Sequence, residues 1–289
     1  MWIVCDWGSS RLRAWLLDAD GKVLNNYESD MGVKQLAGRK DEFHEEMTKV
    51  LRNFEVGFDI PIRISGMAGS KNGWIETEYA STPTGIDNFS SNYKSIQEFP
   101  NLRVYGGIKH ETHDGAIDVM RGEEIQVFGI LLEKPDARLI CLPGTHSKWV
   151  KIENGKIASV RTHMTGDLFH SLSENSIFKE QITSTTFDGD GFLHGCHMAN
   201  EGSGLDRLFR LRTEYVFSKV SANGFHSCLS GFLIANEILA QKAQGTVHLC
   251  GSGPLIKSYA LALEQIHIKS IPVDSESATV RAHIELKRP

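Results

Sequence analysis

Two short turns in the sequence place glycine, hydroxyl side chains and a basic residue close together. The first is Gly8-Ser9-Ser10-Arg11, just after Asp6, and the second is Gly144-Thr145-His146, shortly before Lys148. A glycine lets backbone N–H groups approach an anion closely, and the hydroxyl and basic side chains add donors and positive charge. One such turn alone is most often an ordinary hairpin. The paired occurrence predicts that the two turns hold a polyphosphate from both sides of a cleft.

Two further features fit a nucleotide. Asp6 directly precedes the first turn, and magnesium bound to phosphates keeps several waters and takes only one or two protein carboxylates. Asp6 is therefore the expected metal ligand. Gly251-Ser252-Gly253 lies between a predicted strand and a predicted helix, where a glycine turn can pass close to a nucleotide, although such junctions also use glycine for steric reasons alone. Asp6 and the two turns thus predict a bound polyphosphate with Mg²⁺.

These motifs resemble a known superfamily. Asp6 followed by Gly8 and Ser9 after an opening strand is similar to the first phosphate motif of the sugar kinase, heat-shock protein and actin superfamily. The hairpin at Gly144 resembles its second phosphate motif, and the turn at Gly251 resembles its adenosine motif. The resemblance implies an α/β, two-lobed actin-like ATPase (ribonuclease H-like) fold, in which each lobe has a mixed sheet with flanking helices.

A narrower resemblance is to the 2-dehydro-3-deoxygalactonokinase family. It is carried by segments spread along most of the chain: Asp6 to Arg11, Gly66 to Ser70 with Asn72-Gly73-Trp74, Val119 to Glu124, Pro143 to Trp149 and, more loosely, Ser230 to Ile234. The family phosphorylates 2-dehydro-3-deoxy-D-galactonate with ATP at the 6-hydroxyl, in galactonate breakdown. The resemblance therefore implies a sugar-acid kinase, with the sugar acid and ATP as small-molecule partners.

Phosphoryl transfer needs a carboxylate that accepts the proton of the attacking hydroxyl. Asp114 and Asp118 are both expected at the start of a long helix toward Leu132, where the helix dipole favours negative charge, and one of the two is expected only to cap the helix. Arg121, one turn in, is expected to neutralise the substrate carboxylate or phosphate, or to be an exposed helical arginine. Gly122-Glu123 resembles a Gly-Glu pair in related sugar kinases, which places Glu123 on the substrate side.

The sugar acid itself is expected at Gly66-Met67-Ala68-Gly69-Ser70, which follows a predicted strand. Its backbone N–H groups and the Ser70 hydroxyl suit a carboxylate or keto group. Trp74 is a candidate apolar floor for the sugar, although a single tryptophan more often packs in a core.

The elements that position these residues can be read from hydrophobic patterns and turn signals. Strands at residues 2–5, 11–17 and 22–27 predict an antiparallel meander, followed by a helix at 41–54 capped by Asp41 and a strand at 60–64. Residues 66–107 are expected to form loops and short strands. The second half opens similarly, with strands at 137–142, 149–153 and 156–161 joined by an Asn154-Gly155 turn. Helices and strands are then expected in this order: helices 199–213 and 225–244, strand 246–250, helix 254–266, strand 268–273 and a last helix from 277. The lobes are set at residues 1–117 and 118–289.

Composition excludes several other classes. The 289 residues carry 31 basic and 36 acidic side chains, a formal charge of -5, which disfavours nucleic-acid binding. No stretch approaches the ~20 apolar residues of a membrane span, so a cytoplasmic protein is expected. The five cysteines form no Cys-x-x-Cys motif, and the three that lie in strand-like apolar runs are expected to be buried hydrophobes. The histidines at 110–113 and 194–197 are expected in loops without a metal. Oligomeric state stays open, with a homodimer as one option.

Three alternatives remain at this point. One is a kinase of the same fold that acts on another sugar or an amino sugar. Another is a non-catalytic sugar-acid sensor, which would usually lack a carboxylate at the helix start and carry a DNA-binding segment. The last is a phosphatase for polyphosphate, which would need a strongly basic channel that this charge balance does not supply.

Overall fold

Strands and helices alternate along most of the chain in the computed structural model, which describes residues 1–201, 207–251 and 253–287. The chain divides into two units. Unit 1 comprises residues 1–136, 150–160 and 275–289, and unit 2 comprises residues 137–149 and 161–274. This division differs from the boundary expected at residue 117, because residues 118–136 group with the first unit.

The main sheet of unit 1 has the strand order β3-β2-β1-β4-β7-β6. Its antiparallel β1-β2-β3 meander is the one that the sequence predicts. On the other side of β1, β4 pairs parallel with β1 and β7 pairs parallel with β4. The opening strand is almost fully buried, because helices cover both faces of such sheets. The bounds are β1 Trp2–Trp7, β2 Leu12–Leu17, β3 Val23–Ser29, β4 Ile62–Gly66, β6 Tyr93–Ile96 and β7 Phe99–Tyr105.

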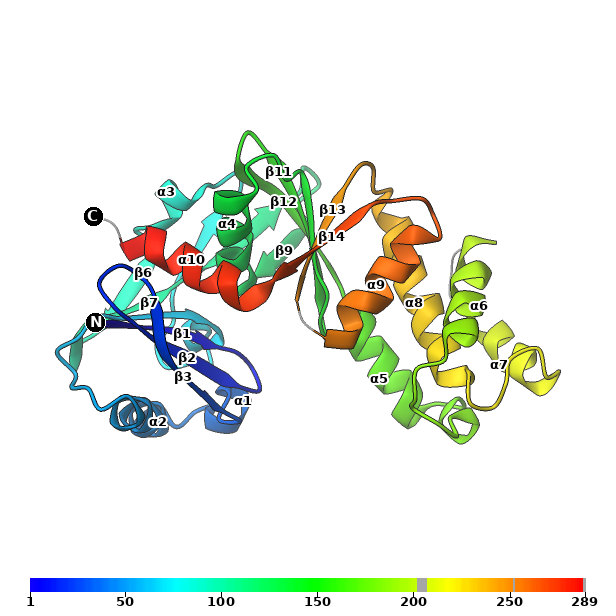
Figure 1. Ribbon diagram of the computed structural model, residues 1–289, viewed down its shortest axis with the longest axis horizontal. Helices are drawn as coiled ribbons and strands as arrows, with labels where there is room; N and C mark the ends of the chain where they lie inside the picture. The colour runs from blue at the N-terminus through cyan, green and yellow to red at the C-terminus, as the bar shows by residue number, and fades with distance from the viewer. Residues whose placement is uncertain (202–206, 252, 288–289) are drawn as a thin grey trace. The chain divides into compact units, whose positions relative to one another are not determined.

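A smaller sheet with the order β5-β8-β9 and several helices complete unit 1. Helix α10 packs along α4 (Figure 1), where a Cβ at Gly129 would lie only 1.9 Å from the carbonyl oxygen of Ala278. The close approach of these helices therefore depends on a glycine. The bounds are β5 Tyr79–Ser81, β8 Gly107–Glu111, β9 Ile117–Met120, α1 Val33–Leu36, α2 Lys40–Asn53, α3 Ile86–Phe89, α4 Glu123–Glu133, α10 Ser275–Lys287 and the 3-10 turn η1 Met67–Gly69.

The prediction that a long helix starts at residue 118 is wrong. Residues 117–120 form strand β9, which pairs antiparallel with β8, and the helix begins only at Glu123. Gly122 has a φ of 106°, a conformation that other residues rarely adopt, and it separates the strand from the helix. One smaller expectation also fails, because Asp41 lies inside α2 and does not cap it. The short strands expected within residues 66–107 include β6 and β7, which belong to the main sheet.

Unit 2 contains most of a sheet with the order β12-β11-β10-β13-β14 and a layer of helices. Helices α6 and α8 pack so closely that a Cβ at Gly195 would lie 2.0 Å from the carbonyl oxygen of Cys228. Helix α6 holds His194 and His197, which were expected in a loop. The bounds are β10 Leu139–Leu142, β11 Ser147–Glu153, β12 Lys156–His163, β13 Val247–Gly251, β14 Ser270–Asp274, α5 Thr165–Asn175, η2 Lys179–Gln181, α6 Gly189–Asn200, α7 Leu208–Val216, α8 Phe225–Gln241 and α9 Gly253–Glu264.

All five cysteines are buried, whereas the sequence predicts this for the three in strand-like runs. Burial raises the pKa of the Cys196 and Cys250 thiols to about 12, so these groups keep their protons at neutral pH. The cysteines therefore act as small core residues.

Candidate functional site

The first hairpin turn joins β1 to β2, and backbone hydrogen bonds fix its shape. The Gly8 N–H donates to the Arg11 carbonyl at 2.8 Å, while the N–H groups of Val33 and Lys34 donate to the carbonyls of Gly8 and Ser9. The turn is thus tied to the first residues of α1. The hydroxyl groups of Ser9 and Ser10 are the side-chain donors that this turn can offer to a phosphate.

Gly32 allows α1 to lie directly against this turn. A Cβ at Gly32 would lie 2.3 Å from the carbonyl carbon of Ser10 and 2.5 Å from the nitrogen of Arg11, and backbone atoms cannot easily move aside. We expect Gly32→Ala to cost about 1–3 kcal/mol in the free energy of unfolding, measured by urea denaturation. Gly189→Ala is the matched control, because a Cβ at that position would meet nothing within 4 Å and the change should be neutral. Equal stability of both variants would contradict the tight fit at Gly32.

Asp6 lies in β1, shortly before the first turn. Its Oδ2 accepts a hydrogen bond from Arg13 Nη2 at 2.5 Å, and its Oδ1 would lie 3.3 Å from a Cβ at Gly66. One carboxylate oxygen is therefore paired with a cation, and the other faces the end of β4. Arg11 is more exposed and forms ion pairs with Glu28 and Asp30, which partly neutralise its charge.

The second hairpin turn packs on the start of α5. The Asp167 N–H donates to the Thr145 carbonyl at 3.0 Å, and a Cβ at Gly166 would lie 2.5 Å from the Gly144 carbonyl oxygen. His146 lies 3.9 Å from Asp167 with both side chains about half exposed. Lys148 donates to the Thr162 hydroxyl on the neighbouring strand at 3.0 Å. Thr165 and Gly166 are thus parts of this site that the sequence reasoning missed.

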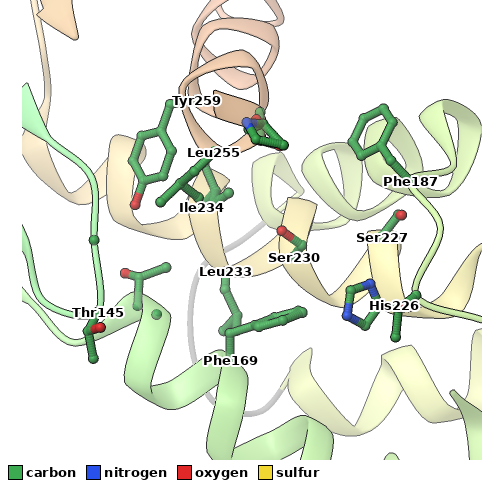
Figure 2. Close-up of a pocket in the computed structure, with 16 residues that line it drawn as sticks. Thr145, Phe169, Phe187, His226, Ser227, Ser230, Leu233, Ile234, Leu255 and Tyr259 are labelled. Atoms are coloured by element: carbon green, nitrogen blue, oxygen red, sulfur yellow. The ribbon is translucent and has the colours of Figure 1, made fainter. Parts of the chain in front are cut away.

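A cavity of about 440 Å³ extends from this turn between the helices of unit 2 (Figure 2). Such a volume fits the sites of small molecules and cofactors. Thr145 lies at one end of the cavity, and Phe187 and His226 lie at the other. The lining residues are Gly144, Thr145, Thr165, Gly166, Phe169, Thr185, Phe187, His226, Ser227, Ser230, Leu233, Ile234, Pro254, Leu255, Ser258 and Tyr259.

Polar and aromatic groups are distributed unevenly in this cavity. Its middle is walled by aliphatic and aromatic side chains, while Ser227 and His226 provide polar atoms at the end away from Thr145. Partial burial lowers the pKa of His226, which favours a neutral ring at pH 7, and this ring packs edge-on against Phe169. Phe187 is 58% exposed, which is unusual for a phenylalanine and leaves its ring accessible at the cavity.

The third glycine turn precedes α9. Gly253 has a φ of 66°, which favours glycine, and the next residues, Pro254 and Leu255, line the cavity. Ser252, which the sequence places in this turn, lies outside the described residues. The turn therefore leads directly into the cavity wall.

The expected sugar-acid segment lies at the end of β4, in unit 1. Gly66 has a φ of 95°, and Ser70 has a buried hydroxyl with no hydrogen-bond partner among the residues that the structure describes. Ala68 is fully buried in the core. Trp74 is 6% exposed and packs among Trp7 and Phe99, so the expectation that it forms a sugar floor is corrected to a core role.

Arg121 is buried beside this segment and is not helical, contrary to expectation. Its guanidinium donates to the Thr77 hydroxyl and, at 3.1 Å, to the Thr77 carbonyl, and lies 4.1 Å over the Tyr79 ring. A Cβ at Gly69 would lie 2.9 Å from Arg121 Nη1. No ion pair involves this guanidinium within the described ranges 1–201, 207–251 and 253–287. A buried cation fixed in this way is suited to binding an anion.

Neither expected base begins a helix. Asp114 lies fully exposed in the β8–β9 turn, where a hydrogen bond from Thr112 lowers its pKa, and Asp118 lies within β9. The carboxylates at the start of α4 are those of Glu123 and Glu124. Burial raises the pKa of Glu124 to about 8, and its two oxygens accept the Gly122 N–H at 2.8 Å. The Glu123 Oε2 accepts the Arg121 N–H at 3.0 Å.

The start of α4 lies against the end of β4. A Cβ at Gly122 would lie 3.0 Å from the Gly66 Cα, and Gly66 in turn lies next to Asp6. Unit 1 therefore brings together the aspartate of the first hairpin, the sugar-acid segment, Arg121 and a helix N-terminus that carries Glu123. The positive end of the helix dipole favours negative charge at this point.

Known proteins resemble the chain over nearly its full length. The model of the 2-keto-3-deoxy-galactonokinase family matches residues 6–286. The chain belongs to this family. A Rhizobium meliloti (strain 1021) protein named as a probable 2-dehydro-3-deoxygalactonokinase is 32% identical over 96% of this chain and 93% of its own length. The 2-dehydro-3-deoxygalactonokinase of Escherichia coli (strain K12) is 32% identical over 83% of this chain and 80% of its own.

Solved structures support the same family and fold. A Sinorhizobium meliloti crystal structure, provisionally assigned as a 2-dehydro-3-deoxygalactonokinase, has a TM-score of 0.92 at 30% identity and covers 100% of this chain and 98% of its own. The activator of the 2-hydroxyisocaproyl-CoA dehydratase from Clostridium difficile, solved with ADPNP, has a TM-score of 0.52 at 11% identity, covering 99% and 93%. The family member therefore has the actin-like α/β fold that the sequence predicts.

Two other expectations concern metals and membranes. The described part of the chain holds no group of three or more His, Cys, Asp or Glu side chains that could bind a metal. A hydrated magnesium ion needs fewer protein ligands, and Asp6, whose Oδ1 is not the oxygen paired with Arg13, fits that requirement. Among the described helices of this family member, none is long and apolar enough to cross a membrane.

Proposed function

We propose that this family member is a kinase that transfers the γ-phosphoryl group of ATP to the 6-hydroxyl of 2-dehydro-3-deoxy-D-galactonate. The observation that carries the proposal is the family match over residues 6–286, which includes both glycine-hydroxyl turns and the start of α4. No observation favours the other sugars or the non-catalytic sensor. Its cytoplasmic location and a homodimeric state stay predictions.

The nucleotide is proposed to occupy the cavity of unit 2. The adenine base would lie near Phe187 and His226, and the phosphates would lie near Gly144 and Thr145. Apolar walls with a few polar groups are typical of base-binding pockets. His146 and Lys148 do not line the cavity, and we propose that they act on the outer phosphates. For the first turn, the proposal remains the one made from the sequence, that Ser9, Ser10 and Arg11 are phosphate ligands.

Magnesium is proposed to bind at Asp6. When bound there, the ion would neutralise charge on the phosphates of ATP. The carboxylate is kept in place by Arg13, whose Nη2 lies 2.5 Å from Oδ2. Because Mg²⁺ keeps most of its water ligands, a single fixed carboxylate oxygen is a sufficient protein contribution.

The sugar acid is proposed to bind beside Arg121, with its carboxylate paired to the guanidinium. This cation is only 8% exposed and is oriented by Thr77 and Tyr79, so little entropy is lost when it binds an anion. The Ser70 hydroxyl and the N–H groups near Gly69 would contact the keto or carboxylate oxygens.

The general base is proposed to be Glu123. In the transfer, the substrate hydroxyl oxygen forms a bond to the γ-phosphorus, the bond to the β-phosphate oxygen breaks, ADP leaves, and the hydroxyl proton passes to the Glu123 carboxylate. The requirement for a carboxylate at a helix N-terminus is unchanged from the sequence argument. We propose Glu123 in place of Asp114 and Asp118, because Glu123 is the first residue of α4.

A coupled ATP-turnover assay tests the substrate. We expect turnover with 2-dehydro-3-deoxy-D-galactonate, and at least about tenfold lower kcat/KM with aldoses and amino sugars, because these lack the carboxylate that Arg121 would bind. The C4 epimer of the substrate is the matched control for the sugar ring. Turnover with a plain hexose but with no keto acid would overturn the proposal.

A further inference from the structure

A chain of buried hydrogen bonds lies behind the cavity of unit 2. The Trp149 indole N–H donates to Glu237 Oε1 at 2.7 Å, and the Tyr259 hydroxyl donates to Glu237 Oε2 at 2.8 Å. The Ser147 hydroxyl lies 2.8 Å from the Tyr259 oxygen. All four residues are at most 3% exposed. They come from β11, α8 and α9, so the chain connects three separate elements.

The chemistry of these groups fixes the direction of each bond. An indole N–H can only donate, and an ionised carboxylate can only accept. The single proton of the Tyr259 phenol is used by Glu237, and burial next to this carboxylate raises the pKa of Tyr259, so the phenol stays protonated. The Ser147 hydroxyl must therefore donate to Tyr259. Its proton is thus used within the chain and is not offered to a phosphate at the preceding turn.

Two neighbouring members of this chain, Ser147 and Tyr259, lie on different walls of the cavity. Ser147 is the first residue of β11 and follows directly on Gly144-Thr145-His146, while Tyr259 lines the cavity on α9, shortly after Pro254. Ser147 and Trp149 are two residues apart on one strand, so both face the helices, and Lys148 between them faces the other way. The hydrogen bonds thus join the hairpin wall to the helix wall.

A carboxylate in this position is costly for a core. Glu237 is 3% exposed and forms no ion pair within the part of the chain that the structure describes. Because burial of a charge without a cation is unfavourable, an apolar side chain would often give a more stable protein. Stability therefore does not explain why a glutamate lies here. What a carboxylate provides is two fixed acceptors that orient Trp149 and Tyr259 at the same time.

We propose that Ser147, Tyr259 and Glu237 are positioning residues that hold the second hairpin turn at a fixed distance from α9. The cavity would then be preorganised for the base and the phosphates of one nucleotide. This inference rests on the proposed function, because it assigns the cavity to ATP. Ser147 then positions the turn and does not bind phosphate, although it belongs to the segment that resembles a phosphate motif.

Nucleotide titrations with purified full-length variants test the inference. Tyr259→Phe removes two hydrogen bonds of the chain, and Ser147→Ala removes one of the same two. We expect each to raise the dissociation constant of ADP and the KM for ATP by about tenfold, with the KM for the sugar acid unchanged. The double variant should be no weaker than Tyr259→Phe alone, because both changes break one connection.

A conservative change at Glu237 separates positioning from charge. In Glu237→Gln the amide oxygen still accepts a hydrogen bond from Trp149, and the amide N–H donates one to the Tyr259 oxygen. The Tyr259 hydroxyl can then donate to the Ser147 oxygen. The connection persists with its direction reversed, so we expect ADP binding within about threefold of the wild type. Glu237→Leu removes both acceptors and should match Tyr259→Phe.

Tyr105→Phe is the control for the loss of a buried hydroxyl. It removes a hydrogen bond to the Leu286 carbonyl in unit 1, so it should lower the melting temperature without changing ADP affinity. If Tyr259→Phe binds ADP as tightly as the wild type, or if the KM values of both substrates rise together, the positioning role is wrong. If the wild type itself binds no adenine nucleotide, the proposed function fails instead.

Discussion

Replacement of Glu123 by Gln is expected to lower kcat by about 10²–10⁴-fold, the range typical for loss of a general base. The amide keeps the size of the side chain and can still accept the Arg121 N–H through its oxygen. It cannot take a proton from the sugar hydroxyl. The affinity for ATP should therefore change little, and single-turnover kinetics with saturating ATP and sugar acid would measure the loss directly.

Three variants serve as controls for this assignment. Asp114→Asn alters a carboxylate in a solvent-exposed turn, and Asp118→Asn alters one inside β9, so neither should slow phosphoryl transfer to a similar degree. Glu124→Gln should act mainly on stability, because that side chain is fully buried and bound to the Gly122 N–H. If Asp118→Asn abolishes turnover while Glu123→Gln remains active, the base lies in the strand and our assignment is wrong.

The misplaced helix start shows where sequence reasoning reaches its limit. The apolar residues Ile117, Met120, Ile125 and Phe128 recur at spacings that suit a helix, and the same stretch alternates well enough for a strand. The pairing of β9 with β8 decides between the two, and this pairing depends on residues about ten positions away. Gly122 was the local signal, because a glycine before two glutamates favours a helix that begins after it.

The two glycine-hydroxyl turns were predictable as turns because their sequence signal is local. Gly8 and Gly144 lie next to the hydroxyl residues of the same turn, so a short stretch of sequence contains the whole motif. The cavity was not predictable in this way, since Phe169, His226 and Leu255 come from three helices that are distant along the chain. The prediction that Trp74 forms a floor for the sugar was wrong for the same reason, because its aromatic neighbours come from other elements.

Replacement of Arg121 by Met is expected to raise the KM for the sugar acid by about 10²-fold, with a much smaller effect on the KM for ATP. Methionine keeps the length and apolar stem of the side chain but removes the buried positive charge. It also leaves the Thr77 hydroxyl and carbonyl without their donor, so the variant should lose some stability. Thermal unfolding with and without the sugar acid separates the two effects, since saturating ligand should stabilise the wild type far more.

The ligand can be changed instead of the protein to isolate the charge. A neutral analogue in which the carboxylate is replaced by a carboxamide should bind the wild type much more weakly than the acid, because the guanidinium then has no anion. In Arg121→Met the two ligands should bind almost equally, whereas Arg121→Lys should keep the preference for the acid in reduced form, since it retains the charge but not the forked geometry. Should Arg121→Met retain the full wild-type preference, another group must bind the carboxylate, and the buried guanidinium would serve only to brace Thr77 and Tyr79.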